Sequence, residues 1–304
     1  MSRAARVQRA ESTSAENLRG AGLMVLSMAA FLCNDAAIKY VTQTLPLGQA
    51  VALRGIAVTA MLWLLARRDG GVVWRPAAPR DRALLALRCA AEIASTLLYL
   101  TALQHLALGD ISSITQSLPL LMMLAAALVF RERLGWRRLT AVGVGLAGVL
   151  IILRPGTSAF TAWSLVALAS VLLIVVRDMA TRGFTPAMRS GTIAFYAALS
   201  VTLAAPLMPA DGGWRWPTGA ETAGVGLAVT FLTVGYLTAV AAMRVGDVGF
   251  VSPFRYTSLV WAIALGMIVF GEWPDRLTWI GAALVVGAGI YSILREARLH
   301  RPRP

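Results

Sequence analysis

Glu92 is a carboxylate within a long apolar stretch, 83–106, and this setting makes it a candidate for chemistry. At the rise of an α-helix it lies about 13–14 Å deep, near the middle of a hydrocarbon core of about 30 Å. A lone carboxylate there is costly and has to be paired or protonated. Arg88, four residues earlier, shares its helix face. The pair is either a substrate or proton site, or a structural ion pair that fixes this helix.

Lys39 is the only lysine among the 28 basic residues. Asp35 precedes it by four residues, which is the favourable order for an ion pair on one helix. Arg54, in the next apolar stretch, is a second possible partner. We expect these three residues to form an extracellular gate or a structural network, with direct contact to the substrate as the alternative.

Two polar runs with a proline interrupt apolar stretches at corresponding places. The first holds Ser112, Ser113, Thr115, Gln116 and Ser117 before Pro119, and the second spans 252–258 with Pro253. Paired interruptions of this kind indicate a substrate site near the membrane midplane. They predict a central cavity bordered by Gln116, Ser117, Arg255 and Tyr256. Two alternatives stay open: a simple kink whose hydroxyls bond back to their own helix, and for Arg255 either a structural role or contact with Glu92 or an anionic substrate group.

The chain contains an internal repeat. Tyr99-Leu100-Thr101-Ala102 recurs as Tyr236-Leu237-Thr238-Ala239, and Gly109-Asp110 recurs as Gly246-Asp247, both at an offset of 137 residues. A constant offset in a hydrophobic chain is typical of a transporter built from two repeats. Tyr99 and Tyr236 are then expected to wall the cavity, one from each half. Asp110 and Asp247 are expected to cap the helices that they open.

Composition and hydropathy indicate an integral membrane protein. Hydrophobic residues make up 58% of the chain and charged residues 14%, with a mean hydropathy of +0.69. Ten apolar stretches approach the length that crosses a bilayer. They are 21–41, 47–66, 83–106, 110–130, 138–153, 160–180, 188–208, 221–243, 248–270 and 277–294. The predicted fold class is all-α, with ten transmembrane helices.

The halves and the termini follow from this count. We expect a disordered cytoplasmic N-terminus (1–19), two five-helix repeats (20–156 and 157–295) and a cytoplasmic tail (296–304). Because five is odd, the repeats must be inverted. With both termini inside, the cytoplasmic segments hold 21 arginines and the outer loops hold 3, in agreement with the positive-inside rule. Glycines in 138–153 and 277–294 permit close helix contact, either within the molecule or at a dimer seam.

Several segments resemble the EamA family of the drug/metabolite transporter superfamily. They include Asn34–Lys39 with Leu45-Pro46 and Leu53-Arg54, then Phe130–Arg133 with the glycine-rich helix and Leu153–Gly156, and finally Pro253–Thr257 through Phe270–Glu272. The resemblance covers nearly the whole chain outside 1–19 and 296–304. It implies ten helices, of which the first, third, fourth, sixth, eighth and ninth surround a central cavity, with the fifth and tenth as packing elements. Members of the family move amino acids, nucleotide-related metabolites, vitamins or S-adenosylmethionine.

The sequence therefore predicts a secondary-active transporter of a small polar or zwitterionic metabolite in a bacterial inner membrane, working by alternating access. The alternative is an uptake carrier for a vitamin or nucleoside-type metabolite, riboflavin-like or S-adenosylmethionine-like. An intramembrane aspartyl protease is a distant alternative, because inverted topology would keep Asp110 and Asp247 a bilayer apart. We expect no enzyme activity and no cofactor, metal or nucleic acid partner. We do expect contact with membrane lipid, possible proton coupling, and a monomer or homodimer. No nucleotide-binding loop is present.

Overall fold

The computed structural model describes residues 14–68, 70–74, 76, 78–130, 136–154, 161–208, 213–245 and 248–299, and all regular elements in this part are helical. The elements of the first half are α1 (Ser14–Val41), α2 (Leu47–Arg68), α3 (Pro79–His105), α4 (Leu108–Thr115), α5 (Leu118–Phe130) and α6 (Trp136–Leu153). Those of the second half are α7 (Ala162–Arg182), α8 (Ser190–Ala204), η2 (Ala205–Leu207), α9 (Gly219–Val245), α10 (Val248–Val251), η3 (Ser252–Tyr256), α11 (Thr257–Phe270) and α12 (Arg276–Leu299).

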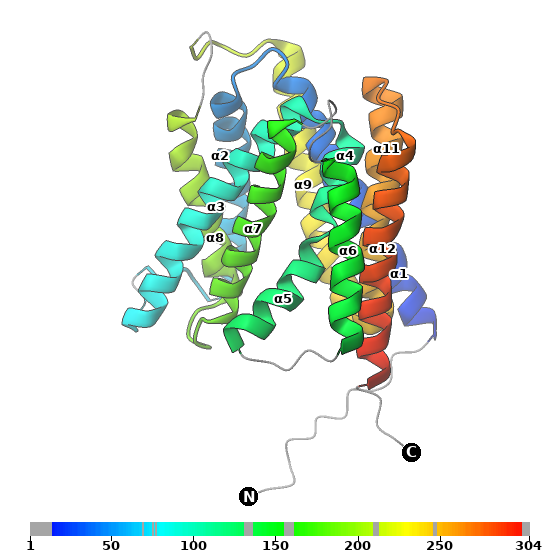
Figure 1. The fold of residues 1–304 in the computed structure, drawn as a ribbon. Helices are drawn as coiled ribbons and strands as arrows, with labels where there is room; N and C mark the ends of the chain where they lie inside the picture. Colours follow the sequence, from blue (N-terminus) through cyan, green and yellow to red (C-terminus); the bar gives the residue numbers. More distant parts are fainter. Residues whose placement is uncertain are drawn as a thin grey trace, which may run out of the picture.

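The helices form one bundle with long axes roughly parallel (Figure 1). Among the described residues, seven helices are long and apolar enough to cross a membrane, and two shorter apolar helices span Leu139–Leu153 and Arg276–Tyr291. The expected stretch 110–130 is divided into α4 and α5. The all-α membrane architecture is thus confirmed, while the number of ten spans stays a prediction. α1 begins at Ser14, so the expectation of disorder through residue 19 is wrong for 14–19, which continue the helix.

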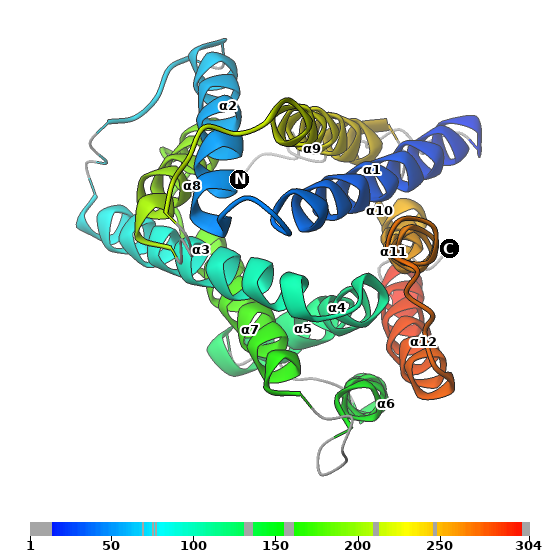
Figure 2. The same cartoon turned by 90° about the horizontal axis from the view of Figure 1, so that it is seen from above.

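Helix contacts repeat between the two halves. α1 packs along α9, and the corresponding helices α7 and α3 pack along each other; α2 packs on its counterpart α8, and α6 on its counterpart α12. Seen from above, the pairs α1–α9, α2–α8 and α3–α7 form a ring with α4 and α11, and α6 and α12 lie outside it (Figure 2). α1 leads away from the end of the bundle where α12 ends, whereas α7 runs toward it (Figure 1). The repeated contact pattern and the opposite directions of α1 and α7 fit two repeats of opposite orientation. We call the end opposite the start of α1 the far end.

Both predicted helix interruptions are present. α4 ends at Thr115 and α5 begins at Leu118, with Pro119 in its first turn, where a missing N–H costs no hydrogen bond. In the second half α10 passes into the 3₁₀-helix η3, which contains Pro253, before α11 begins. α4 packs against α11, so the two interrupted regions of the two halves meet.

The glycine-rich helices α6 and α12 contact each other inside the molecule. A Cβ atom on Gly148 would lie 2.7 Å from the carbonyl oxygen of Gly281, and one on Gly281 would lie 2.6 Å from that of Gly148. Only glycine allows this backbone approach. Gly143 and Gly287 face open space. Of the two alternatives that the sequence allowed, an internal contact or a dimer seam, the contact at Gly148 and Gly281 is internal.

Candidate functional site

Glu92 holds α3 and α7 together near the middle of the bundle. Its Oε2 accepts a hydrogen bond from Arg88 Nη1 at 2.8 Å, and its Oε1 accepts one from Arg177 Nη1 at 3.1 Å. Arg177 Nε also donates to Asp178 Oδ1 at 2.8 Å. The side chains of Arg88 and Glu92 are only 13% and 16% exposed. The predicted pairing of Arg88 with Glu92 is confirmed, and Arg177, from the second repeat, is a partner that we did not predict.

A second polar group lies on α1, α2 and α3. Tyr99 donates its hydroxyl to Asp35 Oδ2 at 2.7 Å, and the side-chain amide of Asn34 donates to Asp35 Oδ1 at 2.9 Å. Arg54 donates from Nη1 to Asn34 Oδ1 over a long 3.4 Å. Asp35 and Arg54 also interact electrostatically, so the predicted neighbourhood of these two residues is present.

Tyr236 connects the two polar groups. Its ring packs edge-on against Phe31 of α1, with ring centroids 5.3 Å apart. Arg54, Glu92, Arg88 and Arg177 all lie close enough to interact electrostatically with its hydroxyl. The side chain is nevertheless 49% exposed. Because charged residues from three other helices surround it, the accessible space that Tyr236 faces lies on the inner side of the helix ring.

The polar run of α4 has two different roles. Ser113, Thr115 and Ser117 donate their hydroxyls to carbonyls of their own helix turn, as the simple-kink alternative describes. Gln116 differs, because its Nε2 donates to Ser258 Oγ of α11 at 2.5 Å. Gln116 thus joins the two interrupted regions, whereas the hydroxyl of Ser117 serves its own helix.

Arg255 and Tyr256 make no hydrogen bond or ion pair with the ionic cluster among the described residues. Tyr256 is 5% exposed and packs on Gly289 of α12, where any Cβ atom would collide with its ring. Within the described part of the chain its hydroxyl has no hydrogen-bond partner. Arg255 is exposed on η3. The suggested meeting of Arg255 with Glu92 is not present among the described residues, where the guanidinium partners of Glu92 are Arg88 and Arg177.

Lys39 pairs with Glu272 rather than with Asp35. Its Nζ lies 2.5 Å from Glu272 Oε1 and donates to the carbonyl of Leu106 at 2.6 Å. Glu272 Oε2 accepts the backbone N–H of Leu108 at 2.7 Å. The expected i,i+4 ion pair is wrong because Asp35 is already bound by Tyr99 and Asn34. We call Lys39, Glu272 and the Leu108 amide the clasp; it lies at the far end and joins α1, α4 and the loop before α12.

Gly271 gives Glu272 its position. It has a φ of 67°, in the left-handed region that glycine adopts without strain. The next residue, Glu272, donates its N–H to the carbonyl of Gly266 at 2.9 Å, so the chain turns back on the end of α11. The turn aims the Glu272 carboxylate at the first amides of α4, where a negative charge is favoured. Asp110 does not cap α4 as expected: it accepts from the Thr278 hydroxyl at 2.9 Å. Asp247 lies outside the described residues.

A polar cavity of about 330 Å³ opens beside the clasp. Its lining includes Asp110, Glu272 and Asp275, together with Arg154 and His105. His105 stacks on Trp163 with ring centroids 3.8 Å apart. Asp275 pairs with Arg154, and this hydrogen bond lowers the pKa of Asp275 to about 2. Asp275 is therefore ionised at every physiological pH.

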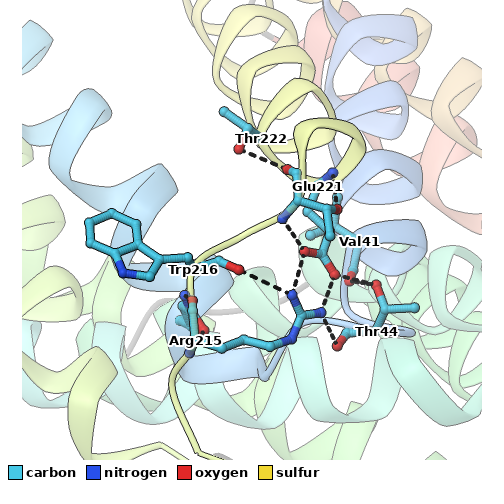
Figure 3. A network of polar contacts seen from close by, with 8 residues as sticks. Val41, Thr44, Arg215, Trp216, Glu221 and Thr222 are labelled. Carbon is cyan, nitrogen blue, oxygen red and sulfur yellow. Dashed lines mark hydrogen bonds and ion pairs between the residues drawn. The ribbon is translucent and has the colours of Figure 1, made fainter.

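A further network at the far end ties the loop before α9 to the turn after α1 (Figure 3). The guanidinium of Arg215 donates to both oxygens of Glu221, at 2.5 and 3.0 Å, and to the carbonyl of Thr44 at 3.1 Å. The hydroxyl of Thr44 donates to Glu221 at 2.7 Å. Trp216, beside this network, is 94% exposed. The network and the clasp both connect the first repeat to the second.

The described residues contain no group of three or more His, Cys, Asp or Glu side chains placed to hold a metal ion. Cys33 and Cys89 are both free thiols in partly buried positions on helices. The chemistry of the bundle interior is therefore that of guanidinium, carboxylate and phenol groups.

A model of the EamA-like transporter family matches the sequence twice, over residues 18–154 and 161–295. The chain belongs to the EamA-like transporter family. The family resemblance of the sequence is thereby confirmed, and the two matches fall on the two halves that share the contact pattern above. EamA members are transporters of the drug/metabolite superfamily, so the membrane-transporter class is established for this chain.

Named relatives carry different substrates. A riboflavin transporter of Rhizobium johnstonii is 31% identical over 60% of this chain, and the match spans only 61% of that protein. The pseudopaline exporter CntI of Pseudomonas aeruginosa is 27% identical over 89% of this chain and 94% of its own. An S-adenosylmethionine uptake transporter of Rickettsia felis is 25% identical over 60% of this chain and 62% of its own. A crystal structure with a TM-score of 0.60 and 22% identity, covering 92% of this chain and 99% of its own, shows the same fold.

Proposed function

We propose that this EamA protein is a secondary-active transporter of a small polar or zwitterionic organic metabolite, acting by alternating access. One observation carries the proposal: charged residues of both repeats meet near the middle of a membrane-embedded bundle, with Glu92 of α3 bound to Arg177 of α7. Ionisable groups at this depth are expensive and mark substrate or ion pathways. Two repeats that share a central charged site can rock around it.

The clasp supports an outer gate in this scheme. Lys39 is 9% exposed and Glu272 22%, and together they fasten α1 of the first repeat to the last loop of the second. The gate role expected for Lys39 is kept, with Glu272 in place of Asp35 as its partner. Substrate access from the far end then requires this pair to separate. The opposite end of the bundle has to close when the far end opens.

The relatives leave two alternatives for the substrate and the direction. Riboflavin and S-adenosylmethionine transporters among them favour a vitamin or nucleoside-type uptake carrier as the second candidate. The pseudopaline exporter, which matches over the larger share of both chains, favours export. The aspartyl protease alternative gains no support, because Asp110 is bound to Thr278 and faces the far-end cavity.

Counterflow in proteoliposomes tests the transport proposal. Compounds that raise the melting temperature of the purified protein are selected first, because a ligand that binds the folded state stabilises it by an amount that grows with the logarithm of its concentration over its Kd. We expect at least one of them to show saturable exchange of labelled for unlabelled compound. Flux that rises linearly with concentration and shows no exchange would indicate a channel or scramblase and contradict a carrier.

Orientation is proposed from the arginine distribution: both termini in the cytoplasm, the far end outside, in the cytoplasmic membrane of a bacterium. Trp216 at the far end and Trp74 at the opposite end are both exposed, so they make a matched pair of labelling positions. In a variant without Cys33 and Cys89, Trp216→Cys should react with an impermeant maleimide in intact spheroplasts. Trp74→Cys should react only after permeabilisation, and the reverse pattern would refute this orientation.

A further inference from the structure

Arg54 is a guanidinium inside the bundle that has little to bind. Among the described residues its one hydrogen bond is the 3.4 Å contact to Asn34, and no carboxylate oxygen lies within 4.0 Å of its nitrogens. Arg88 and Arg177, by contrast, both bind Glu92 at 3.1 Å or less. A guanidinium presents five donors, so most of the donors of Arg54 remain available.

The nearest carboxylates are not hydrogen-bonded to Arg54. Asp35 accepts hydrogen bonds from Tyr99 and Asn34, and Glu92 accepts them from the two arginines of its cluster. Arg88 Nε is a further buried donor without a partner in the described part of the chain. The polar interior therefore contains guanidinium donors that no acceptor among the described residues uses. A ligand that fits it must supply acceptor oxygens and negative charge.

An exposed aromatic side chain lies near Arg54. Tyr236 is half exposed toward the inner side of the helix ring, and its hydroxyl interacts electrostatically with Arg54. Phe31 and Tyr236 form an aromatic wall there. A cation inside a membrane protein costs several kcal/mol unless an anion accompanies it. A planar anion with two oxygens matches the fork of the guanidinium.

We propose that Arg54 receives the carboxylate group of the transported metabolite, with the Phe31–Tyr236 wall beside the rest of the molecule. The proposal rests on the proposed transport function and narrows its substrate class to carboxylate-bearing compounds. Asp35 holds Tyr99 and Asn34 in place next to Arg54 and supplies the compensating charge when the site is empty. The role of Arg54 is thus substrate binding rather than gating.

The test uses pairs of compounds that differ only in this group: amino acids and small organic acids, each with its primary amide. Binding to the purified wild-type protein is measured by thermal shift and calorimetry. We expect carboxylates to bind and their amides to bind roughly 10- to 100-fold more weakly, since hydrogen bonds between charged groups contribute at about this level. A panel in which amides bind as well as carboxylates, or in which no carboxylate binds, overturns the proposal.

Two variants and a matched control assign the effect to Arg54. Arg54→Gln should raise the Kd of the bound carboxylate by a similar factor while leaving the weak binding of the amide unchanged. Arg54→Lys keeps the charge but loses the two-pronged guanidinium, so its Kd for the carboxylate should lie between those of wild type and Arg54→Gln. This variant also serves as the test if the glutamine variant folds poorly. Arg67→Gln removes an arginine of the same helix that stacks on Trp63, and should bind as wild type. Equal carboxylate affinity in Arg54→Lys and wild type contradicts the bidentate role.

The outcome separates this proposal from the proposed function. If the protein exchanges only amines or neutral compounds in counterflow, transport stands and the assignment of Arg54 fails. If no compound of any class exchanges, the transport function itself fails. Phosphate esters, offered as an additional arm, distinguish a general anion site from a carboxylate site: tighter binding of phosphate esters than of carboxylates overturns the carboxylate assignment.

Discussion

Replacing Glu92 by glutamine is expected to destabilise the protein and to stop transport. The substitution keeps the shape of the side chain but leaves Arg88 and Arg177 without their shared carboxylate. Breaking a buried ion pair from one side costs about 3–5 kcal/mol. The bridge to Arg177 of the other repeat adds to this cost, because the variant also weakens an ionic contact between the packed helices α3 and α7.

A double variant separates the structural from the functional contribution. Glu92→Gln combined with Arg177→Gln removes one charge of each sign, so we expect it to recover much of the lost melting temperature. Transport should remain at background in the double variant, because the charged site is still absent. Asp178→Asn, which removes a carboxylate that is 33% exposed beside Arg177, serves as the control and should lower the melting temperature only slightly. Should the double variant regain transport together with stability, Glu92 is a structural residue.

Much of the fold followed from the sequence because it depends on local rules. Apolar stretches give helices, proline breaks them, and the repeated Tyr-Leu-Thr-Ala segments locate corresponding helices of the two halves. The errors lie at helix ends. α1 starts at Ser14, ahead of the apolar stretch, and α4 starts at Leu108 without a side-chain cap of its own. The group that does bind its first amide is Glu272, 164 residues away, which no local pattern indicates.

The site was predictable only where partners are neighbours in sequence. The spacing of Arg88 and Glu92 is four residues and gave the correct pair. Arg177 lies inside the stretch 160–180 that we expected to span the membrane, yet it was counted among the cytoplasmic arginines. Its position within that stretch was the available signal, since a charge there requires a partner. Lys39 and Glu272 are 233 residues apart, and only the packing of the two repeats brings them together.

Neutralising either half of the clasp is the second change with a large expected effect. Glu272→Gln leaves the Lys39 ammonium without its carboxylate, next to Phe270, and weakens the bond to the Leu108 amide. Lys39→Met leaves the Glu272 carboxylate without its ammonium partner, but the Leu108 amide still binds it. We expect both to lower the free energy of unfolding, Glu272→Gln by about 3–5 kcal/mol. The double variant should lose less than the sum of the two, because neither charge is then left alone.

Hydrogen exchange makes this test specific for the gate. The amide of Leu108 donates directly to Glu272, so peptides covering the start of α4 should exchange faster in Glu272→Gln than in wild type, with a smaller change in Lys39→Met. Asp275→Asn provides the control in the same loop: its carboxylate is 49% exposed and its ion pair with Arg154 is worth at most about 1 kcal/mol.

A gate that opens during transport must separate at low cost relative to global unfolding. We therefore expect added substrate to speed exchange at Leu108 in the wild-type protein by favouring the open state. Exchange at Leu108 as slow as that of the core of α1, with or without substrate, would make the clasp a permanent structural tie and leave the far end without a gate.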